Sequence, residues 1–305
     1  MKTVLIVNSL VTRHRFADRS KLKNYARGNH GLACDIWVTE SRGQATHLAS
    51  EAIKSGYEMV VAVGGDGTVN EVLNGFFDKG VALSQHVTLG IVPLGSGCDF
   101  ARSLGIPKKI DEAITTLESS RVRRIDVGRV EFLNFRRERE IRLFANIADV
   151  GAGGLVTQRA SRAPRILGRR PNYVWGILSA VLSYKAKPVS VSIDGGEPMR
   201  LAVRNLIVAN GKYFGRGFLP APHARIDDGL FDIVNIRDFS TIQSVWHLPK
   251  LRKGTHLGLE KVSCFRGKKV EANADEEVLL EIDGELVGTV PATFQIIPEA
   301  VSIKV

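Results

Sequence analysis

Apolar positions in the first 120 residues follow two alternating patterns. Short runs rich in Val, Ile and Leu occupy residues 4–7, 34–38, 59–63 and 87–92. Between the second and third runs, apolar residues recur with helical spacing. They are Ala45, Leu48, Ala49, Ala52 and Ile53, and Gly56 follows as a helix-ending residue. Short apolar strands that alternate with helices predict a parallel sheet covered by helices.

From about residue 123 the pattern changes to short strand-like segments joined by turns. These segments are residues 125–132, 141–150, 189–193, 201–209, 230–236, 278–282 and 293–297. Helical patterns near residues 155–167, 172–186 and 240–253 interrupt the series. Frequent short strands with Asp-Gly and Gly-Gly turns predict an antiparallel, sandwich-like or barrel-like domain.

The chain of 305 residues is long enough for two domains. We therefore predict a fold of the class α/β + β. Residues 1–124 would form an N-terminal parallel α/β domain, and residues 125–292 a C-terminal antiparallel β-sandwich-like domain. The C-terminal tail, about residues 293–305, can return to the first domain and pack against it.

Composition adds a strong positive charge to this picture. The formal net charge is +10, which indicates an anionic partner: nucleic acid, nucleotide phosphates or an anionic membrane surface. No zinc-finger, RNP or helix-turn-helix signature accompanies the basic residues, so nucleic acid is not expected. A solvated basic face is the plain alternative to a membrane-docking patch.

The chain has the composition of an ordinary globular protein, with 44% hydrophobic residues. The longest apolar stretch, about residues 174–182, is far shorter than the roughly 20 residues of a membrane-spanning helix. The N-terminus shows no signal-peptide core, and Cys34, Cys98 and Cys264 form neither a zinc motif nor an even set for disulfides. We expect a cytoplasmic protein.

The first candidate for chemistry is a glycine-rich loop after the third apolar run. Residues 64–71 read Gly-Gly-Asp-Gly-Thr-Val-Asn-Glu and lie between a predicted strand and a predicted helix. Glycines let the backbone approach a ligand, and a helix N-terminus favours phosphate. The letters match neither the dinucleotide fingerprint nor a Walker A loop. A plain glycine-rich turn is the alternative.

Asp66 is an unusual residue inside a phosphate loop. A carboxylate repels phosphate unless a cation lies between them or the group handles a proton. Asp66 therefore indicates Mg²⁺ or proton chemistry, and a helix N-cap is the structural alternative.

A second glycine loop follows the fourth apolar run. Residues 93–102 again read as strand end, glycine-rich loop and helix start, with a hydroxyl at Ser96 and a carboxylate at Asp99. Ligands bind open α/β sheets at the carboxyl ends of the strands, so we expect both loops to line one cleft.

Together, GGDGTVNEVLNG and PLGSGCDFAR resemble the motifs of the diacylglycerol kinase catalytic domain family, which includes sphingosine and ceramide kinases. Later segments resemble further blocks of the family in the same order, so the resemblance covers nearly the whole chain. These segments are residues 210–215, 221–222, 226–232 and 282–285. The resemblance implies a nucleotide-binding α/β domain, a β-rich lipid-substrate domain, and an ATP- and Mg²⁺-dependent lipid kinase.

The resemblance also implies roles for single residues. Asp66 would act through Mg²⁺ or a proton, and Asp283 or Glu285 would be the general base that takes the proton of the lipid hydroxyl. A structural Mg²⁺ would bind the Asp228 carboxylate and the carbonyls of Arg225 and Leu230. The implied nucleotide contacts are Asn8, Thr39, Gly64, Gly65, Asp66, Gly67, Thr68, Asn70, Glu71, Gly95 and Ser96.

Ordinary structural roles are alternatives for several of these residues. Thr39 also fits an ordinary strand end, and the Asp-Asp-Gly and Asp-Gly-Glu segments fit ordinary turns. The chain departs from the family in Asn8-Ser9-Leu10, where an Asn-Pro turn is usual, and in Cys98, which cannot replace an asparagine amide. Either change is compatible with a shifted substrate or a member without activity.

Two other functions and several partners follow from the same residues. An NAD kinase-like enzyme also uses a GGDG loop, and a non-catalytic lipid- or nucleotide-binding member would keep the cleft.

The expected partners are a membrane lipid substrate, an anionic membrane surface that the protein contacts peripherally, and a second copy in a possible homodimer. Residues 173–184 fit a packed helix or an interfacial segment, and the acceptor lipid is left open.

Overall fold

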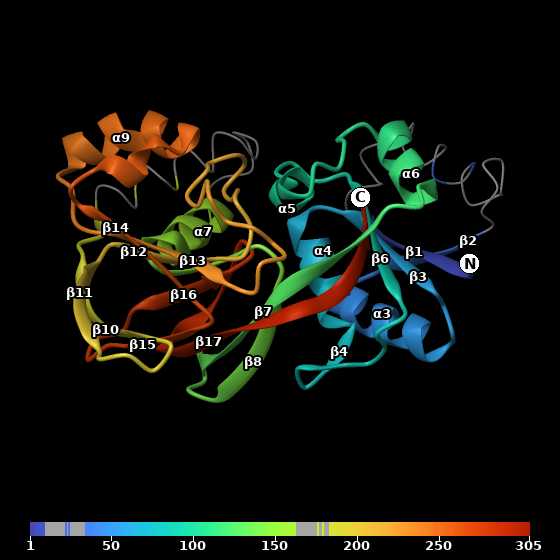
Figure 1. Cartoon of the computed structure of the whole chain (residues 1–305), viewed down its shortest axis with the longest axis horizontal. Coiled ribbons are helices and arrows are strands. Elements are labelled where there is room, and N and C mark those ends of the chain that lie inside the picture. Colours follow the sequence, from blue (N-terminus) through green and yellow to red (C-terminus); the bar gives the residue numbers. More distant parts are fainter. Residues whose placement is uncertain (10–21, 23, 25–33, 163–175, 177–178, 180–182) are drawn as a thin grey trace. The chain divides into compact units, whose positions relative to one another are not determined.

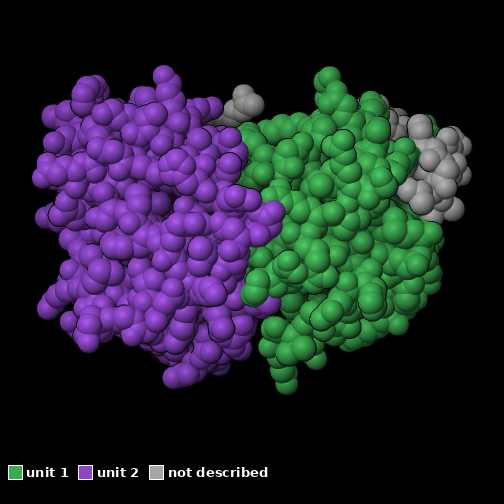
Figure 2. All heavy atoms as spheres, viewed as in Figure 1, with its two compact units in different colours: residues 1–127, 298–305 green, residues 128–297 purple. Residues whose placement is uncertain are grey.

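The computed structural model describes residues 1–9, 22, 24, 34–162, 176, 179 and 183–305 (Figure 1). The chain forms two compact units (Figure 2). Unit 1 contains Met1–Val127 and Pro298–Val305, and unit 2 contains Gly128–Ile297. A parallel α/β core in the first and a β-rich structure in the second confirm the predicted fold class.

Unit 1 is built on a parallel sheet of apolar strands. Its strands are β1 (Thr3–Asn8), β2 (Cys34–Thr39), β3 (Met59–Gly64) and β6 (Thr88–Pro93), in the order β6-β3-β1-β2. Every residue of β3 and β6 is buried. Strands covered on both faces read as continuous apolar runs, which is why the sequence pattern predicted them.

Several helices of unit 1 are described over their whole length. They are α3 (Gln44–Lys54), α4 (Asp66–Asn74), α5 (Asp99–Ser103) and α6 (Ile110–Glu118). Buried residues of α3 include Ala45, Ala49, Ala52 and Ile53, which belong to the predicted apolar stripe. A two-stranded ribbon, β4 (Phe77–Asp78) with β5 (Val81–Ala82), follows α4.

Two long strands carry the chain between the units. They are β7 (Val122–Asn134) and β17 (Glu285–Lys304). At the end of β17, Ser302 and Ile303 pair in parallel with β6. The Glu299 amide donates a 2.8 Å hydrogen bond to Asp126, so the last residues of the chain are fastened to unit 1.

Unit 2 is a mainly antiparallel assembly around an aromatic core. One run of strands has the order β14 (Val262–Gly267), β13 (Phe231–Ile236), β12 (Asn205–Ala209), β9 (Ile147–Gly151), β16 (Leu279–Ile282) and β17. The ring of Phe144 stacks on Phe231 at 5.6 Å and meets Phe294 edge-on at 6.4 Å. These rings belong to one buried cluster that holds the strands together.

Further described elements of unit 2 are β8 (Arg139–Phe144), β10 (Lys187–Ile193), β11 (Met199–Val203), β15 (Lys269–Asn273), α7 (Ala152–Arg162), α9 (Thr241–Lys253) and the short η2 (Thr255–Gly258). Helix α9 matches the predicted residues 240–253, and its capping box at Ser240 fixes its start. The predicted helix at 155–167 corresponds to α7, which begins three residues earlier, and residues 163–167 lie outside the described residues. The predicted helix at 172–186 lies largely outside the described residues.

Two strand predictions in unit 2 were wrong, and two strands were missed. Residues 141–150 form two strands, β8 and β9, because the chain turns where the amides of residues 145–147 bind Asp283. Residues 201–209 also form two strands, since the buried Arg204 between them pairs with Asp238 at 2.8 Å. Strands β14 and β15 were missed because their residues are half exposed and partly polar.

A pair of carboxyl groups is buried in this sheet. Asp149 on β9 and Glu281 on β16 are register partners, with 0% and 1% exposure. Asn205 donates to both oxygens of Asp149, and the Gly284 amide donates to Glu281. Burial raises the pKa of Asp149 to about 7, and burial together with Asp149 raises the pKa of Glu281 well above its usual value.

These raised pKa values predict that the protein is less stable at pH 8 than at pH 5. The folded state keeps protons that the unfolded chain has released above about pH 4, so stability falls as pH rises toward 7. For Asp149 the loss is on the order of 2–4 kcal/mol. Asp149→Asn retains an acceptor oxygen and is expected to flatten the dependence of Tm on pH. Equal slopes in the wild type, Asp149→Asn and the exposed control Glu260→Gln would contradict this.

Candidate active site

The first glycine loop lies at the carboxyl end of β3. Strand β3 ends at Gly64, and helix α4 begins at Asp66, with Gly65 in an extended conformation between them. A Cβ built on Gly64 would overlap the side chain of Thr68, so the first turn of the helix packs directly on the loop. The free amides of that turn form the kind of helix N-terminus that binds phosphate.

The second glycine loop touches the first, backbone against backbone. The amides of Leu94 and Gly95 donate to the Gly64 carbonyl, at 2.8 and 3.2 Å. A Cβ built on Gly95 would clash with the Cα of Gly65. Strands β3 and β6 are neighbours in the sheet, so their carboxyl ends bring both loops to one edge.

This contact predicts that Gly95→Ala separates the loops. We expect a lower Tm, since the two backbones cannot keep their distance with a methyl group between them. For the ATP binding that the family resemblance implies, we expect an affinity at least about tenfold weaker. Thermal unfolding and equilibrium ATP binding would measure the effects. Gly258→Ala is the matched control, because a Cβ there meets nothing within 4 Å. Unchanged ATP binding in Gly95→Ala would contradict the expectation.

Asp66 links the two loops through its side chain. Its Oδ1 atom accepts a 3.1 Å hydrogen bond from the Phe100 amide, in the first turn of α5. The N-cap residue of α4 is Gly65, which has no side chain to cap the helix. The prediction that Asp66 is the N-cap of the helix that follows its own loop is therefore wrong, because Gly65 holds that position and Asp66 is the first residue of α4. Asp66 instead caps the first turn of α5, the helix of the other loop.

Cys98 has a local role in the second loop. It adopts a left-handed conformation, with φ of 57°, just before α5, and its thiol donates to the Gly95 carbonyl at 3.3 Å. Burial raises the pKa of the Cys98 thiol to about 11, so the group stays protonated. Ser96 is exposed beside it and keeps its hydroxyl available.

Two further predicted residues end neighbouring strands at the same edge. Asn8 ends β1 and donates a 3.0 Å hydrogen bond to the Thr68 hydroxyl, and the buried Thr39 ends β2.

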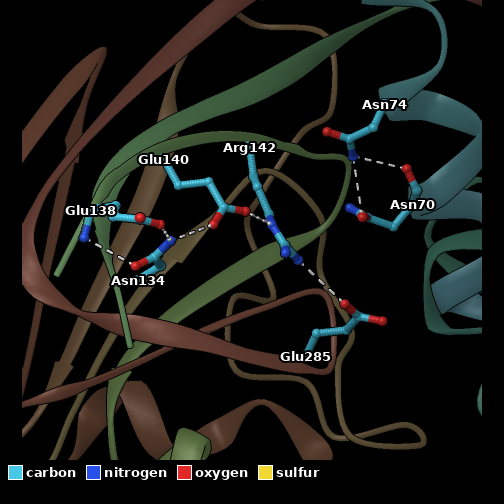
Figure 3. A network of polar contacts seen from close by, with 7 residues as sticks. All are labelled: Asn70, Asn74, Asn134, Glu138, Glu140, Arg142 and Glu285. Atoms are coloured by element: carbon cyan, nitrogen blue, oxygen red, sulfur yellow. Dashed lines mark hydrogen bonds and ion pairs between the residues drawn. The ribbon is translucent and has the colours of Figure 1, made fainter. Parts of the chain in front are cut away.

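Two other predicted residues, Asn70 and Glu71, lie within α4. Asn70 accepts two hydrogen bonds from Asn74 one turn along the helix (Figure 3). The Glu71 carboxylate accepts from the Ala45 amide at 3.2 Å and so secures the first turn of α3. The Glu71 carboxylate therefore has a structural role in joining α3 to α4.

Asp283 and Glu285, the two candidates for the base, have different surroundings in unit 2. Asp283 and Gly284 both have positive φ and form the two-residue turn between β16 and β17. The Asp283 carboxylate accepts three backbone hydrogen bonds, of 2.9 to 3.2 Å, from the amides of residues 145–147. A carboxylate used in this way holds two chain segments together and is poorly placed to collect a proton.

Glu285 lies in a network of charged side chains instead (Figure 3). Its Oε2 atom is 3.4 Å from Arg142 Nη1, and Arg142 Nε donates to Glu140 at 2.7 Å. Asn134 extends the network by donating to Glu140 and Glu138. The Glu285 side chain is 24% exposed, so it is oriented by Arg142 and still reachable by a ligand. Arg142 was missed in the sequence because its partner is 143 residues away.

At the predicted structural metal site, the Asp228 carboxylate is already paired with a cationic side chain. Asp228 accepts a 3.2 Å hydrogen bond from the Leu230 amide and forms an ion pair with Arg266, which also lies 3.4 Å from Asp232. Arg225 is exposed, with its guanidinium 3.9 Å from Asp227. A structural Mg²⁺ at this turn stays a prediction, and binding it would require Arg266 to release Asp228.

Within the described part of the chain, no group of three or more His, Cys, Asp or Glu side chains is arranged to hold a metal. Mg²⁺ that is carried by a nucleotide takes one or two carboxylates and completes its shell with phosphates and water. Asp66, beside the helix N-terminus, is the carboxylate that suits this role.

Among the described residues, no helix is long and apolar enough to span a bilayer.

Comparison with known proteins gives a consistent picture over both units. Residues 2–130 match the family described as "Diacylglycerol kinase catalytic domain", and residues 146–305 match "YegS C-terminal NAD kinase beta sandwich-like domain". A curated diacylglycerol kinase of Bacillus subtilis is 30% identical over 273 residues, which cover 87% of this chain and 83% of the relative. Another from Staphylococcus haemolyticus is 30% identical, with 87% and 76% covered.

A solved structure shows the same fold. The crystal structure of a putative diacylglycerol kinase from Bacillus anthracis aligns with a TM-score of 0.79 at 24% identity. The alignment covers 99% of this chain and 94% of that one.

Proposed function

Because the chain belongs to the diacylglycerol kinase family, we propose that it transfers the γ-phosphoryl group of ATP, with Mg²⁺, to a hydroxyl of diacylglycerol or a related lipid. The observation that supports this most directly is the contact of two glycine loops at the carboxyl ends of β3 and β6. A helix N-terminus and an acidic residue, Asp66, stand at this contact, as nucleotide phosphates with a bound cation require.

Phosphoryl transfer depends mainly on positioning and on stabilising charge. The first turn of α4 would hold the phosphate oxygens, and the exposed Ser96 and the strand-end residues Asn8 and Thr39 would contact the nucleotide. Asp66 would act beside the phosphates through Mg²⁺, and its hydrogen bond to Phe100 keeps it oriented. Bound Mg²⁺ would supply neutralisation of the charge on the phosphate oxygens.

The acceptor hydroxyl needs a base, and we assign this role to Glu285. Its carboxylate would take the hydroxyl proton as the lipid oxygen bonds to the γ-phosphorus and the bond to the departing ADP oxygen breaks. Arg142 would orient the carboxylate for this step. Asp283 would instead keep the turn in shape through its three backbone contacts.

Diacylglycerol is proposed as the first acceptor to test because the curated relatives carry that name. The family described for residues 146–305 includes NAD kinase in its name, so NAD is the second acceptor. The positive net charge supports peripheral contact with an anionic membrane surface, where such a lipid would be met.

The test is a transfer assay with γ-labelled ATP and Mg²⁺. Mixed micelles would present diacylglycerol, monoacylglycerol, sphingosine or ceramide, and NAD would be offered separately in solution. Label in one lipid supports the proposal and identifies the acceptor. Label in NAD alone would replace it with an NAD kinase, and ATP binding without transfer to any acceptor would favour a non-catalytic member.

A further inference from the structure

Helix α9 in unit 2 directs apolar side chains toward solvent. Ile242, Val245 and Trp246 are 83%, 44% and 70% exposed, and Pro249 is exposed as well. Their spacing of three, four and seven residues from Ile242 places all four on one face of the helix. This outward apolar stripe, residues 242, 245, 246 and 249, is the opposite of the arrangement in an ordinary surface helix.

The other face of α9 already fastens the helix to unit 2. The His247 ring meets Phe239 at 5.0 Å, and the Leu251 carbonyl accepts a 3.1 Å hydrogen bond from the Leu219 amide. Ser240 caps the first turn and fixes where the helix begins. Figure 1 shows α9 along one edge of unit 2. Packing therefore does not account for the outward apolar stripe.

The charge on this helix has one sign. Lys250, Arg252 and Lys253 lie in its last turn, and it contains no acidic residue. The Lys250 ammonium lies 5.4 Å from the Trp246 ring centre, which places a cation beside the apolar stripe. Over residues 237–261 there are five Lys or Arg and two Asp or Glu, and one of the two, Asp238, is paired with Arg204.

We propose that α9 docks unit 2 on an anionic membrane surface, with the outward apolar stripe in the headgroup boundary and the basic last turn on lipid phosphates. Trp, Ile and Val beside Lys and Arg are the composition of helices that lie in the membrane interface. A second copy of the chain fits less well, since a two-fold contact through α9 would add the same basic residues from both copies. The biological reason for docking rests on the proposed function, because a lipid kinase must reach its acceptor in the membrane.

The test measures binding of the full chain to sedimented vesicles that contain no acceptor lipid. Vesicles of phosphatidylcholine with phosphatidylglycerol are compared with vesicles of phosphatidylcholine alone. The double variant Ile242→Ser, Trp246→Ser is expected to lose at least tenfold in partition to the anionic vesicles. The matched control is Phe135→Ser, an exposed aromatic residue outside α9, at 56% exposure, and it should bind like the wild type.

A second measurement reads the helix directly. In a Trp37→Phe, Trp175→Phe background, Trp246 is the remaining tryptophan, and its emission should shift to the blue on anionic vesicles and be quenched by brominated lipid. Unchanged Trp246 emission while the protein is bound, or equal partition of the double variant and the wild type, would overturn the proposal. A change from dimer to monomer in the double variant, without loss of vesicle binding, would assign the stripe to a second copy.

These outcomes are separate from the outcome of the transfer assay. Vesicle binding through Trp246 without phosphoryl transfer to any lipid would leave α9 as a docking helix and overturn the proposed function. Transfer to lipid in micelles, with no vesicle binding through α9, would support the function and overturn the docking role.

Discussion

Asp66→Asn is expected to lower kcat for phosphoryl transfer by about 10²–10³-fold, with little change in Tm. Asparagine keeps an oxygen that can accept the hydrogen bond from the Phe100 amide, so the contact between the two glycine loops is preserved. The substitution removes the negative charge that would hold Mg²⁺ beside the phosphates. Steady-state kinetics with the identified acceptor and thermal unfolding would measure the two effects.

Comparing Asp66→Asn with Asp66→Ala separates the effect of the charge from that of the hydrogen bond. Asp66→Ala is the second variant. It removes both, so we expect an equal or larger loss of kcat together with a lower Tm, as the α5 amide loses its cap. Asp111→Asn, in the exposed first turn of α6, is the matched control and should leave both quantities unchanged. Full activity in Asp66→Asn with loss only in Asp66→Ala would show that Asp66 acts solely by holding the loops together.

Glu285→Gln is expected to lower kcat by about 10²–10⁴-fold without affecting the folded state. Glutamine has nearly the same shape as glutamate and can still bind Arg142, but it cannot accept the proton of the acceptor hydroxyl. A loss in kcat with a nearly unchanged KM for ATP would place the defect in the chemical step.

Asp283→Ala provides the contrast within the same turn. It leaves three backbone amides without their acceptor, so we expect a loss of about 3 kcal/mol in the free energy of unfolding. Chemical denaturation would measure that loss, and activity per folded molecule should fall less than in Glu285→Gln. The reverse result, with a stable Asp283→Ala protein that has lost its kcat and an active Glu285→Gln protein, would transfer the role of base to Asp283.

The parts of the fold that the sequence predicted have their causes close together in the chain. The strands β3 and β6 are buried along their whole length, so they stand out as apolar runs, and α3 carries a stripe of helical spacing. The strand breaks at residues 145–146 and at Arg204 have distant causes, namely Asp283 and Asp238. A pattern read along the chain contains no signal for such contacts.

The sequence by itself determined the fold class, the family resemblance and the two glycine loops, because glycine spacing and strand–loop–helix order are local properties. Only the tertiary structure decided what the polar residues do. It brought the Asp66 side chain to the first turn of α5, which begins 33 residues later. It paired the Asp283 carboxylate with the amides of residues 145–147, and it placed Glu285 beside Arg142. It also turned the outward apolar stripe of α9 to solvent, since the face that a helix buries depends on the surface it packs against.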